Sequence, residues 1–473
     1  MMTGGVGQGS AMAGEAAREL AFAPVRALAY PERVQFVDLQ HRVPIGDFDG
    51  DGVAEFFIHA KPFELEAVGA PSAWMVEIDL KEVRLDRLVR TPVDGATPVR
   101  NQTVQIAAAD LDGDRDEDLV VREIQSDVIS GPFAQLPRSR FVTLENRGGK
   151  FVQVGRFPDE AMLDNAFALI DLNGDGVKDV LAGQRADERA DARLLRLISN
   201  GAAGFAEGQI VTFPQMEMVI NYVTDAGDLN LDGFGDAWIS QNGFGASDAA
   251  LGGAEGTITI GPSIHGWVLE SVGPDDFDGD GVIDAVRTIV PFSIAGCSPV
   301  SFLQLARGEG DGSFDAFGRQ LELNGHSRGA ISSDLLIDGE PVVIVAMNIQ
   351  CGGLPKFLTL VTSFNGAGIG ETTSLPIPFD FSDQFQIESF DVDADGDRDI
   401  LLFHESGVLM FERLGAAAPS ADVNQDGRVD ASDIEMALAQ WGQSGAADLN
   451  RDGVVDIADL SILLNSQTVA IER

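Results

Sequence analysis

The sequence is poor in cysteine and in basic residues, and it lacks long apolar runs. Two cysteines in 473 residues exclude a small disulfide-dense scaffold. The 32 lysines and arginines are outnumbered by 75 aspartates and glutamates, for a formal net charge of −43. Such a surface repels phosphates, so nucleic acid is excluded as a partner. No run of about 18 apolar residues occurs, so no transmembrane segment is predicted.

Motifs of known catalytic chemistry are also missing. The five histidines are scattered, without a zinc-protease pair or a Cys/His cluster, and there is no nucleophile elbow. Carboxylates abound, but repeated loops account for them, so a glycosidase acid pair cannot be picked from this background. We therefore expect no catalytic residue and no organic cofactor.

The first residues also lack a basic segment followed by an apolar one, the pattern of a secretory signal. We predict that residues 1–19 form a disordered leader.

What the sequence does contain is one acidic loop, repeated along the chain. Residues 276–284 have the sequence DFDGDGVID. Alternate side chains of a tight loop can converge on one point, carboxylate oxygens suit a hard cation, and glycine permits the turn around it. Side chains at positions 1, 3, 5 and 9 and the carbonyl at position 7 are the expected ligands. So many oxygen ligands favour Ca²⁺ over Mg²⁺.

Six copies keep this pattern, with Arg115 replacing the usual glycine in the second. The predicted ligands are Asp47, Asp49, Asp51, Val53, Glu55, Asp110, Asp112, Asp114, Asp116, Asp118, Asp171, Asn173, Asp175, Val177, Asp179, Asp228, Asn230, Asp232, Phe234, Asp236, Asp276, Asp278, Asp280, Val282, Asp284, Asp391, Asp393, Asp395, Asp397 and Asp399. A decayed copy starts at Asp334 but has Leu336 and Val342 at positions 3 and 9, so we expect weak or no ion binding there.

The loops recur at intervals of 48 to 63 residues, and apolar runs and hairpin signals flank them. Each unit is therefore predicted as four strands, with the loop joining the first two. This period favours a seven-bladed all-β propeller over residues 20–414. The segment before the first loop resembles an outermost strand, so we expect the N-terminal part to complete the last blade and close the ring.

The loops that begin at Asp110, Asp171, Asp228, Asp276 and Asp391, with their apolar flanks, resemble FG-GAP/VCBS repeats of integrin-α-like propellers. The resemblance implies an extracellular or cell-surface protein with several structural calcium ions. We favour a role for the loops as structural staples, because a ligand site would be expected on one or two blades only.

Residues 415–420 are predicted as a linker to a different module at 421–467. There a loop–helix pattern occurs twice, 26 residues apart, and each loop runs into a helix. The predicted ligands are Asp422, Asn424, Asp426, Arg428, Asp430, Asp433, Asp448, Asn450, Asp452, Val454, Asp456 and Asp459.

The duplicated loop–helix is similar to type I dockerins, which implies a cohesin-like partner. Dockerins often carry a hydroxyl pair after position 9. Here Ala431–Ser432 and Ile457–Ala458 stand in its place, so a small calcium-folded tag is the safer interpretation.

Three further expectations concern the cysteines, the tryptophans and one Gly-rich segment. Cys297 and Cys351 lie in nearly equivalent connections of adjacent units, so we hypothesise a disulfide between them, the alternative being two thiols. The four tryptophans are interpreted as core residues. The Gly-rich residues 241–266 are predicted as a connecting loop on the face opposite the acidic loops, and as the best candidate for ligand contact.

The leading hypothesis is a monomeric, non-enzymatic binding or adhesion protein, with a protein or polysaccharide ligand. A glycan-binding lectin is the first alternative, because related propellers bind sugars between blades. A polysaccharide-degrading lyase or hydrolase is the second, because calcium propellers and dockerins both occur in such enzymes.

Overall fold

The computed structural model describes residues 22–30, 34–36, 43–51, 53–62, 73–80, 84–90, 101–125, 138–157, 163–184, 192–202, 204–205, 209–213, 220, 222–240, 247–264, 275–277, 279–289, 300–324, 326–337, 340–348, 356–361, 364–365, 368–369, 372–377, 385–393, 398–404, 407–413, 423, 431–441, 447, 455, 460 and 463. The predicted leader, the linker and both cysteines lie outside these residues.

The described strands form seven sheets, numbered here in chain order. The first sheet contains β2 (Val34–Phe36), β3 (Ile45–Gly46), β4 (Glu55–Pro62), β5 (Ala73–Asp79) and β6 (Arg84–Arg90). The second contains β7 (Asn101–Ala109), β8 (Asp118–Gln125), β9 (Arg138–Glu145) and β10 (Val152–Phe157). The third contains β11 (Leu163–Ile170), β12 (Asp179–Gln184), β13 (Ala192–Leu197) and β14 (Gln209–Phe213).

The fourth sheet contains β15 (Tyr222–Gly227), β16 (Asp236–Ser240), β17 (Ser247–Leu251) and β18 (Thr259–Ile264). The fifth contains β19 (Ala285–Ile289), β20 (Val300–Gly308), β21 (Phe314–Asn324), β25 (Phe364–Asn365) and β26 (Gly368–Ile369). The sixth contains β22 (His326–Ile337), β23 (Glu340–Asn348), β24 (Lys356–Val361) and β27 (Thr372–Ile377). The seventh contains β28 (Phe385–Phe390), β29 (Asp399–His404), β30 (Gly407–Phe411) and β1 (Arg26–Ala29).

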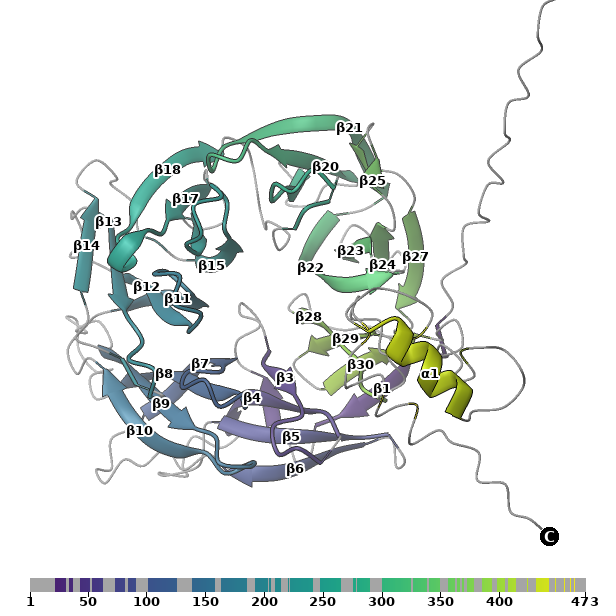
Figure 1. The fold of residues 1–473 in the computed structure, drawn as a ribbon, viewed down its shortest axis with the longest axis horizontal. Coiled ribbons are helices and arrows are strands. Elements are labelled where there is room, and N and C mark those ends of the chain that lie inside the picture. Colours follow the sequence, from purple (N-terminus) through teal and green to yellow (C-terminus); the bar gives the residue numbers. More distant parts are fainter. Residues whose placement is uncertain are drawn as a thin grey trace, which may run out of the picture.

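The sheets stand side by side in a ring around a common centre (Figure 1). In the third and fourth sheets, β11 and β15 lie toward the centre, and β14 and β18 form the outer wall. The prediction of an all-β propeller is confirmed. The helical elements of the described residues are α1 (Ala431–Ala439) and the short η1 (Ala254–Gly256), and Leu460 and Leu463 are also helical. Neither α1 nor η1 could cross a membrane, because both are too short.

The predicted closure by the N-terminal segment is confirmed. Strand β1 pairs antiparallel with β30, with Arg26 opposite Met410 and Ala29 opposite Gly407. A buried Glu388 in β28 adds a second link, because its Oε1 accepts a hydrogen bond of 2.9 Å from the amide of Val43 in the first unit. Closure pairs a strand edge that would otherwise be exposed.

The core lies between neighbouring sheets. One cluster joins residues of the first and seventh sheets, where the rings of Phe56 and Phe403 meet edge to face at 4.9 Å. Another joins the second and third sheets, including Phe141 and Phe167 at 5.1 Å. Such aromatic pairs add to the stabilisation from burial. Each sheet therefore depends on its neighbours for burial of its apolar faces.

Trp238 of β16 is buried, as predicted. The interpretation of Trp441 as a core residue is wrong, because 45% of its surface is exposed just beyond the end of α1. The apolar spacing indicated an inward face, but the small core of this module is formed by other side chains, including Ala437 and Leu463.

Candidate metal centres

The acidic loops join the first two strands of their sheets, as predicted. Their ninth residue begins the second strand and pairs with the residue just before position 1. Asp118 faces Ala109 in the second sheet, and Asp179 faces Ile170 in the third. In the fifth sheet the same two positions, Asp275 and Asp284, form a β-bridge. Each loop therefore spans eight residues at a fixed register.

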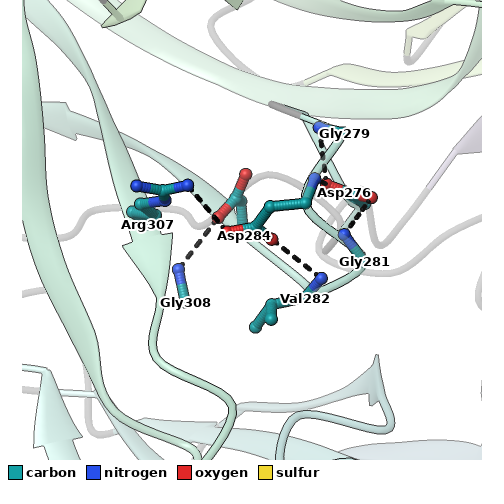
Figure 2. Close-up of polar contacts among 8 residues, drawn as sticks. Asp276, Gly279, Gly281, Val282, Asp284, Arg307 and Gly308 are labelled. Atoms are coloured by element: carbon teal, nitrogen blue, oxygen red, sulfur yellow. Dashed lines mark hydrogen bonds and ion pairs between the residues drawn. The ribbon is translucent and has the colours of Figure 1, made fainter. Parts of the chain in front are cut away.

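The first-position carboxylate organises the loop backbone. In the third loop, Asp171 Oδ1 accepts the amides of Gly174 and Asp175 at 2.8 and 3.1 Å, and Oδ2 accepts that of Gly176 at 2.9 Å. Figure 2 shows the same arrangement in the fifth loop, where Gly279 and Gly281 both donate to Asp276 at 2.8 Å. The chain is thereby wrapped around one carboxylate.

This wrapping requires left-handed backbone at positions 4 and 6. Glycine provides it at most of these positions, such as Gly176 with φ of 87°. Arg115 at position 6 of the second loop and Leu231 at position 4 of the fourth adopt φ of 79° and 58°. The loop conformation is therefore retained where glycine is missing, at a cost in backbone strain.

The ninth-position carboxylates have a second role that the sequence did not reveal. They are 0 to 1% exposed: Glu55, Asp118, Asp179, Asp236, Asp284 and Asp399. In the third sheet, Asp179 Oδ2 accepts the amide of Leu172 at 3.1 Å, and Oδ1 accepts that of Ser199 at 2.7 Å. One buried carboxylate thus holds the loop and the turn after the third strand.

This pair of bonds recurs in three other sheets. The loop residue at position 2 donates to one oxygen at 2.8 to 3.1 Å, and the turn residue donates to the other at 2.7 to 2.8 Å; the donor pairs are Leu111 and Asn146, Leu229 and Gly252, and Val392 and Arg413. In the fifth sheet, Gly308 donates to Asp284 at 2.9 Å (Figure 2). Position 2 is always a buried apolar residue, and that regularity was the available sequence signal.

Glu55 in the first loop differs from Asp118, Asp179, Asp236 and Asp399, each of which accepts two backbone amides. Its Oε2 accepts the amide of Phe48 at 2.8 Å, but its buried Oε1 has no hydrogen-bond partner among the described residues. The exposed carboxylates of Asp47, Asp49 and Asp51 lie beside it, with one oxygen of each residue within 4.8 Å of the others. A buried carboxylate oxygen beside three further oxygen donors fits a hard cation such as calcium.

Two other groups of carboxylates have the same spacing, with oxygens within 4.8 Å of one another: Asp110, Asp112 and Asp118, and Asp391, Asp393 and Asp399. Their oxygen-only composition also suits calcium. Because the ninth-position aspartates already hold backbone amides, the described carboxylates at positions 3 and 5, which are exposed or half-buried, are the ones most available to an ion.

The electrostatics of the loops favour a cation as well. Burial raises the pKa of Glu55 to about 7, and the charges of Asp49, Asp47 and Asp51 act in the same direction. Burial also raises the pKa of Asp118, Asp179 and Asp236 to about 6. Desolvation penalises these charges, and a bound cation would offset that penalty.

The fifth loop has an internal cation. Arg307 at the end of β20 places its Nη2 2.8 Å from Asp280 Oδ2, the predicted fifth-position ligand. The equivalent strand-end residue of the second sheet is Glu145, which pairs with Arg147 instead. The two loops therefore differ in charge at a matched position.

Several predicted ligands fall outside the described residues. These are Asp278, Asp395, Asp397 and all those of the C-terminal module except Asp433, whose backbone lies in α1. The decayed copy differs in architecture, since β22 and β23 remain paired up to Ile337 and Glu340. Only two residues separate these strands. Asp334 therefore lies within a strand, and the eight-residue acidic loop of the other sheets is not formed here.

The prediction that residues 241–266 form a connecting loop is wrong. Strands β17 and β18 and the turn between them occupy residues 247–264, and this turn lies beside the acidic loop rather than opposite it, because Gly252 bonds to Asp236. The small residues serve packing: Ala249 and Ala250 are buried, and a Cβ at Gly252 would lie 2.2 Å from the Gly235 oxygen. Small side chains here permit close approach of backbone.

Residues 420–466 match the family model described as the Dockerin type I domain. The duplicated loop–helix pattern is thereby confirmed as a dockerin module. Dockerin type I domains bind calcium. No curated protein matches the chain.

Solved propellers resemble the structure at low sequence identity. The BBS1N chain in complex with ARL6DN is 12% identical, covering 84% of this chain and 98% of its own, with a TM-score of 0.48. The exotype rhamnogalacturonan lyase YesX is 13% identical, covering 82% and 76%, with a TM-score of 0.44. An α-L-arabinanase of Penicillium chrysogenum, complexed with arabinobiose, is 12% identical, covering 84% and 99%, with a TM-score of 0.44. Similarities at this level carry no information on function.

Proposed function

We propose that the protein is an extracellular, non-enzymatic binding protein whose propeller is held rigid by calcium. Its dockerin module attaches it to a partner. The observation that carries the attachment role is the dockerin match at residues 420–466. Dockerin modules are typically extracellular or on the cell surface, and they bind cohesins, so a cohesin-like protein is the partner to test first.

The structural role of the loops is supported by their repetition. A buried carboxylate with backbone donors at matched positions recurs in the second, third, fourth and seventh sheets. A site for one ligand would instead differ from its neighbours. Calcium, when bound, would supply positive charge among carboxylates that otherwise repel one another, and its binding would therefore be linked to folding. The resemblance to FG-GAP/VCBS repeats is consistent with this role.

The test combines a metal count with thermal unfolding, with calcium and with a chelator. Full-length protein should retain several calcium ions per chain and melt at a lower temperature in chelator. A Glu55→Gln variant should bind less calcium than the wild-type chain, because it removes the charge from the buried oxygen that has no described partner. A melting temperature indifferent to chelator would refute the staple.

Two further assays address partner and activity. Pull-down with immobilised cohesins should retain the full chain but not a chain ending before the linker, at 414. A glycan array, and incubation with polysaccharides, should give neither sugar binding nor product. Sugar binding without turnover would support the lectin, and release of oligosaccharides would replace the non-enzymatic assignment with a lyase or hydrolase.

A further inference from the structure

Hydrogen bonds join the acidic loop of one sheet to a turn or loop of the next sheet. Asn146, in the turn after β9, donates its side-chain amide to the carbonyl of Phe48 in the first loop at 2.8 Å. Ser199, at the same place in the third sheet, directs its hydroxyl to the carbonyl of Leu111 in the second loop at 3.5 Å. Gly235 of the fourth loop donates its amide to the carbonyl of Asp171 in the third at 2.7 Å.

Residues of the first two contacts also donate their amides to a buried ninth-position carboxylate. Asn146 and Leu111 both donate their amides to Asp118, and Ser199 donates to Asp179. Phe48 and Leu111 therefore each bind their own ninth-position carboxylate through the amide and the next sheet through the carbonyl. We call this alternating series of bonds, from Phe48 to Asp236, the rim relay. Its central groups are buried, so water cannot replace a broken bond cheaply.

Tight packing accompanies the relay. A Cβ at Gly149, in the turn that Asn146 begins, would lie 2.4 Å from the Cβ of Asp49. A Cβ at Gly174 in the third loop would lie 2.9 Å from the carbonyl oxygen of Gly233 in the fourth. With so little space, a change in one loop is transmitted to the next.

We propose that the loops of the first four sheets bind cations cooperatively through the rim relay. This inference rests on the proposed calcium binding. An ion fixes the backbone of its loop, including the second-position peptide. That peptide then presents a fixed acceptor to the next sheet, whose turn holds the following loop. Ordering one loop thus reduces the entropy that its neighbour must lose on binding, which produces positive coupling.

The test is a double-mutant cycle on the full chain, measured by calorimetric titration with calcium. Asp49→Ala removes an exposed carboxylate of the first loop and keeps the Cβ on which Gly149 packs. In the wild-type background, Asp49→Ala should remove one ion and weaken the remaining propeller sites by roughly five-fold or more. In an Asn146→Ser background it should remove the same ion but leave the other affinities within about two-fold.

Asn146→Ser is chosen because the chain itself shows a tolerated serine there. Ser199 occupies the equivalent position and caps its turn by accepting the amide of Gly201 at 3.1 Å. Serine at 146 should keep that cap but weaken the bond to Phe48, because the shorter Ser199 side chain lies 3.5 Å from its acceptor whereas Asn146 lies 2.8 Å from the carbonyl of Phe48. The control is Asn200→Ala, whose side chain caps only its own turn, accepting the amide of Ala202 at 3.0 Å. The effect of Asp49→Ala must persist in this background.

Two results would overturn the coupling while leaving calcium binding intact. One is an unchanged set of remaining affinities after Asp49→Ala in the wild-type chain. The other is an equal loss with and without the Asn146 side chain. If Asn146→Ser does not fold, Ser199→Ala with Asp112→Ala repeats the cycle at the next junction. Failure of the wild-type propeller to bind calcium would refute both the proposed function and the coupling.

Discussion

Replacing Asp179 with alanine separates the two roles of the ninth-position carboxylates. Asp179 is fully buried and accepts the amides of Leu172 and Ser199. Asp179→Ala leaves the buried amide of Ser199 without an acceptor and that of Leu172 with only the Ile170 carbonyl at 3.0 Å, so the free energy of unfolding should fall by about 1–3 kcal/mol or more. That is a large part of the 5–15 kcal/mol typical of a folded protein.

The assay is denaturant unfolding at pH 5 in chelator, followed by tryptophan fluorescence. Burial raises the pKa of Asp179 to about 6, so the wild-type carboxyl is mostly neutral at pH 5 and its charge hardly enters. The control is Asp175→Ala in the same loop. Asp175 is exposed and its Oδ1 accepts the amide of Val177 at 2.9 Å, so this variant should lose no more than about 1 kcal/mol.

Both residues are predicted ligands. If their only role were to bind metal, the two variants would have the same free energy of unfolding in chelator. An equal free energy of unfolding for the two variants in chelator would refute a structural role for the ninth position.

Three further predictions concern the same loops. In chelator, stability should fall as pH rises from about 4 to 7, because a folded-state pKa raised above the unfolded value favours folding on the acid side; the groups are Glu55, Asp118, Asp179 and Asp236. Melting curves across this range check it, and a melting temperature that rises with pH would contradict it. Arg307→Ala should tighten calcium binding at the fifth loop roughly two- to five-fold in calorimetry, because an exposed ion pair contributes about 0.2–1 kcal/mol; unchanged affinity would show that Arg307 does not compete. Gly252→Ala should lower the free energy of unfolding by about 1–3 kcal/mol or more, because its Cβ would lie 2.2 Å from the Gly235 oxygen; a variant as stable as wild type in denaturant would contradict this packing.

Much of the architecture was predictable from the sequence. The repeated loops fixed the register of the hairpins, and Asp118, Asp179 and Asp236 begin strands where the pattern placed them. Local rules suffice for this, since aspartate caps and glycine turns act within a few residues. Ring closure through β1 was also predictable, because an incomplete last unit and a spare first strand complement each other.

Other features depend on contacts between residues far apart in the chain. The Gly-rich segment at 247–264 had a loop-like composition, yet it forms two strands because small residues fit where backbones approach closely. Trp441 matched an apolar helical pattern, yet its exposure is set by how the rest of its module packs. Asn146 gave no signal at all, because its partner Phe48 lies in another sheet.

The sequence by itself determined that this chain carries repeated acidic loops suited to calcium, arranged in hairpins of a propeller and followed by a dockerin module. These follow from local periodicity and residue chemistry. Only the tertiary structure decided which carboxylate of each loop is buried and what it binds. That distinction depends on the turn after the third strand, which the fold brings to the loop from 14 to 28 residues away.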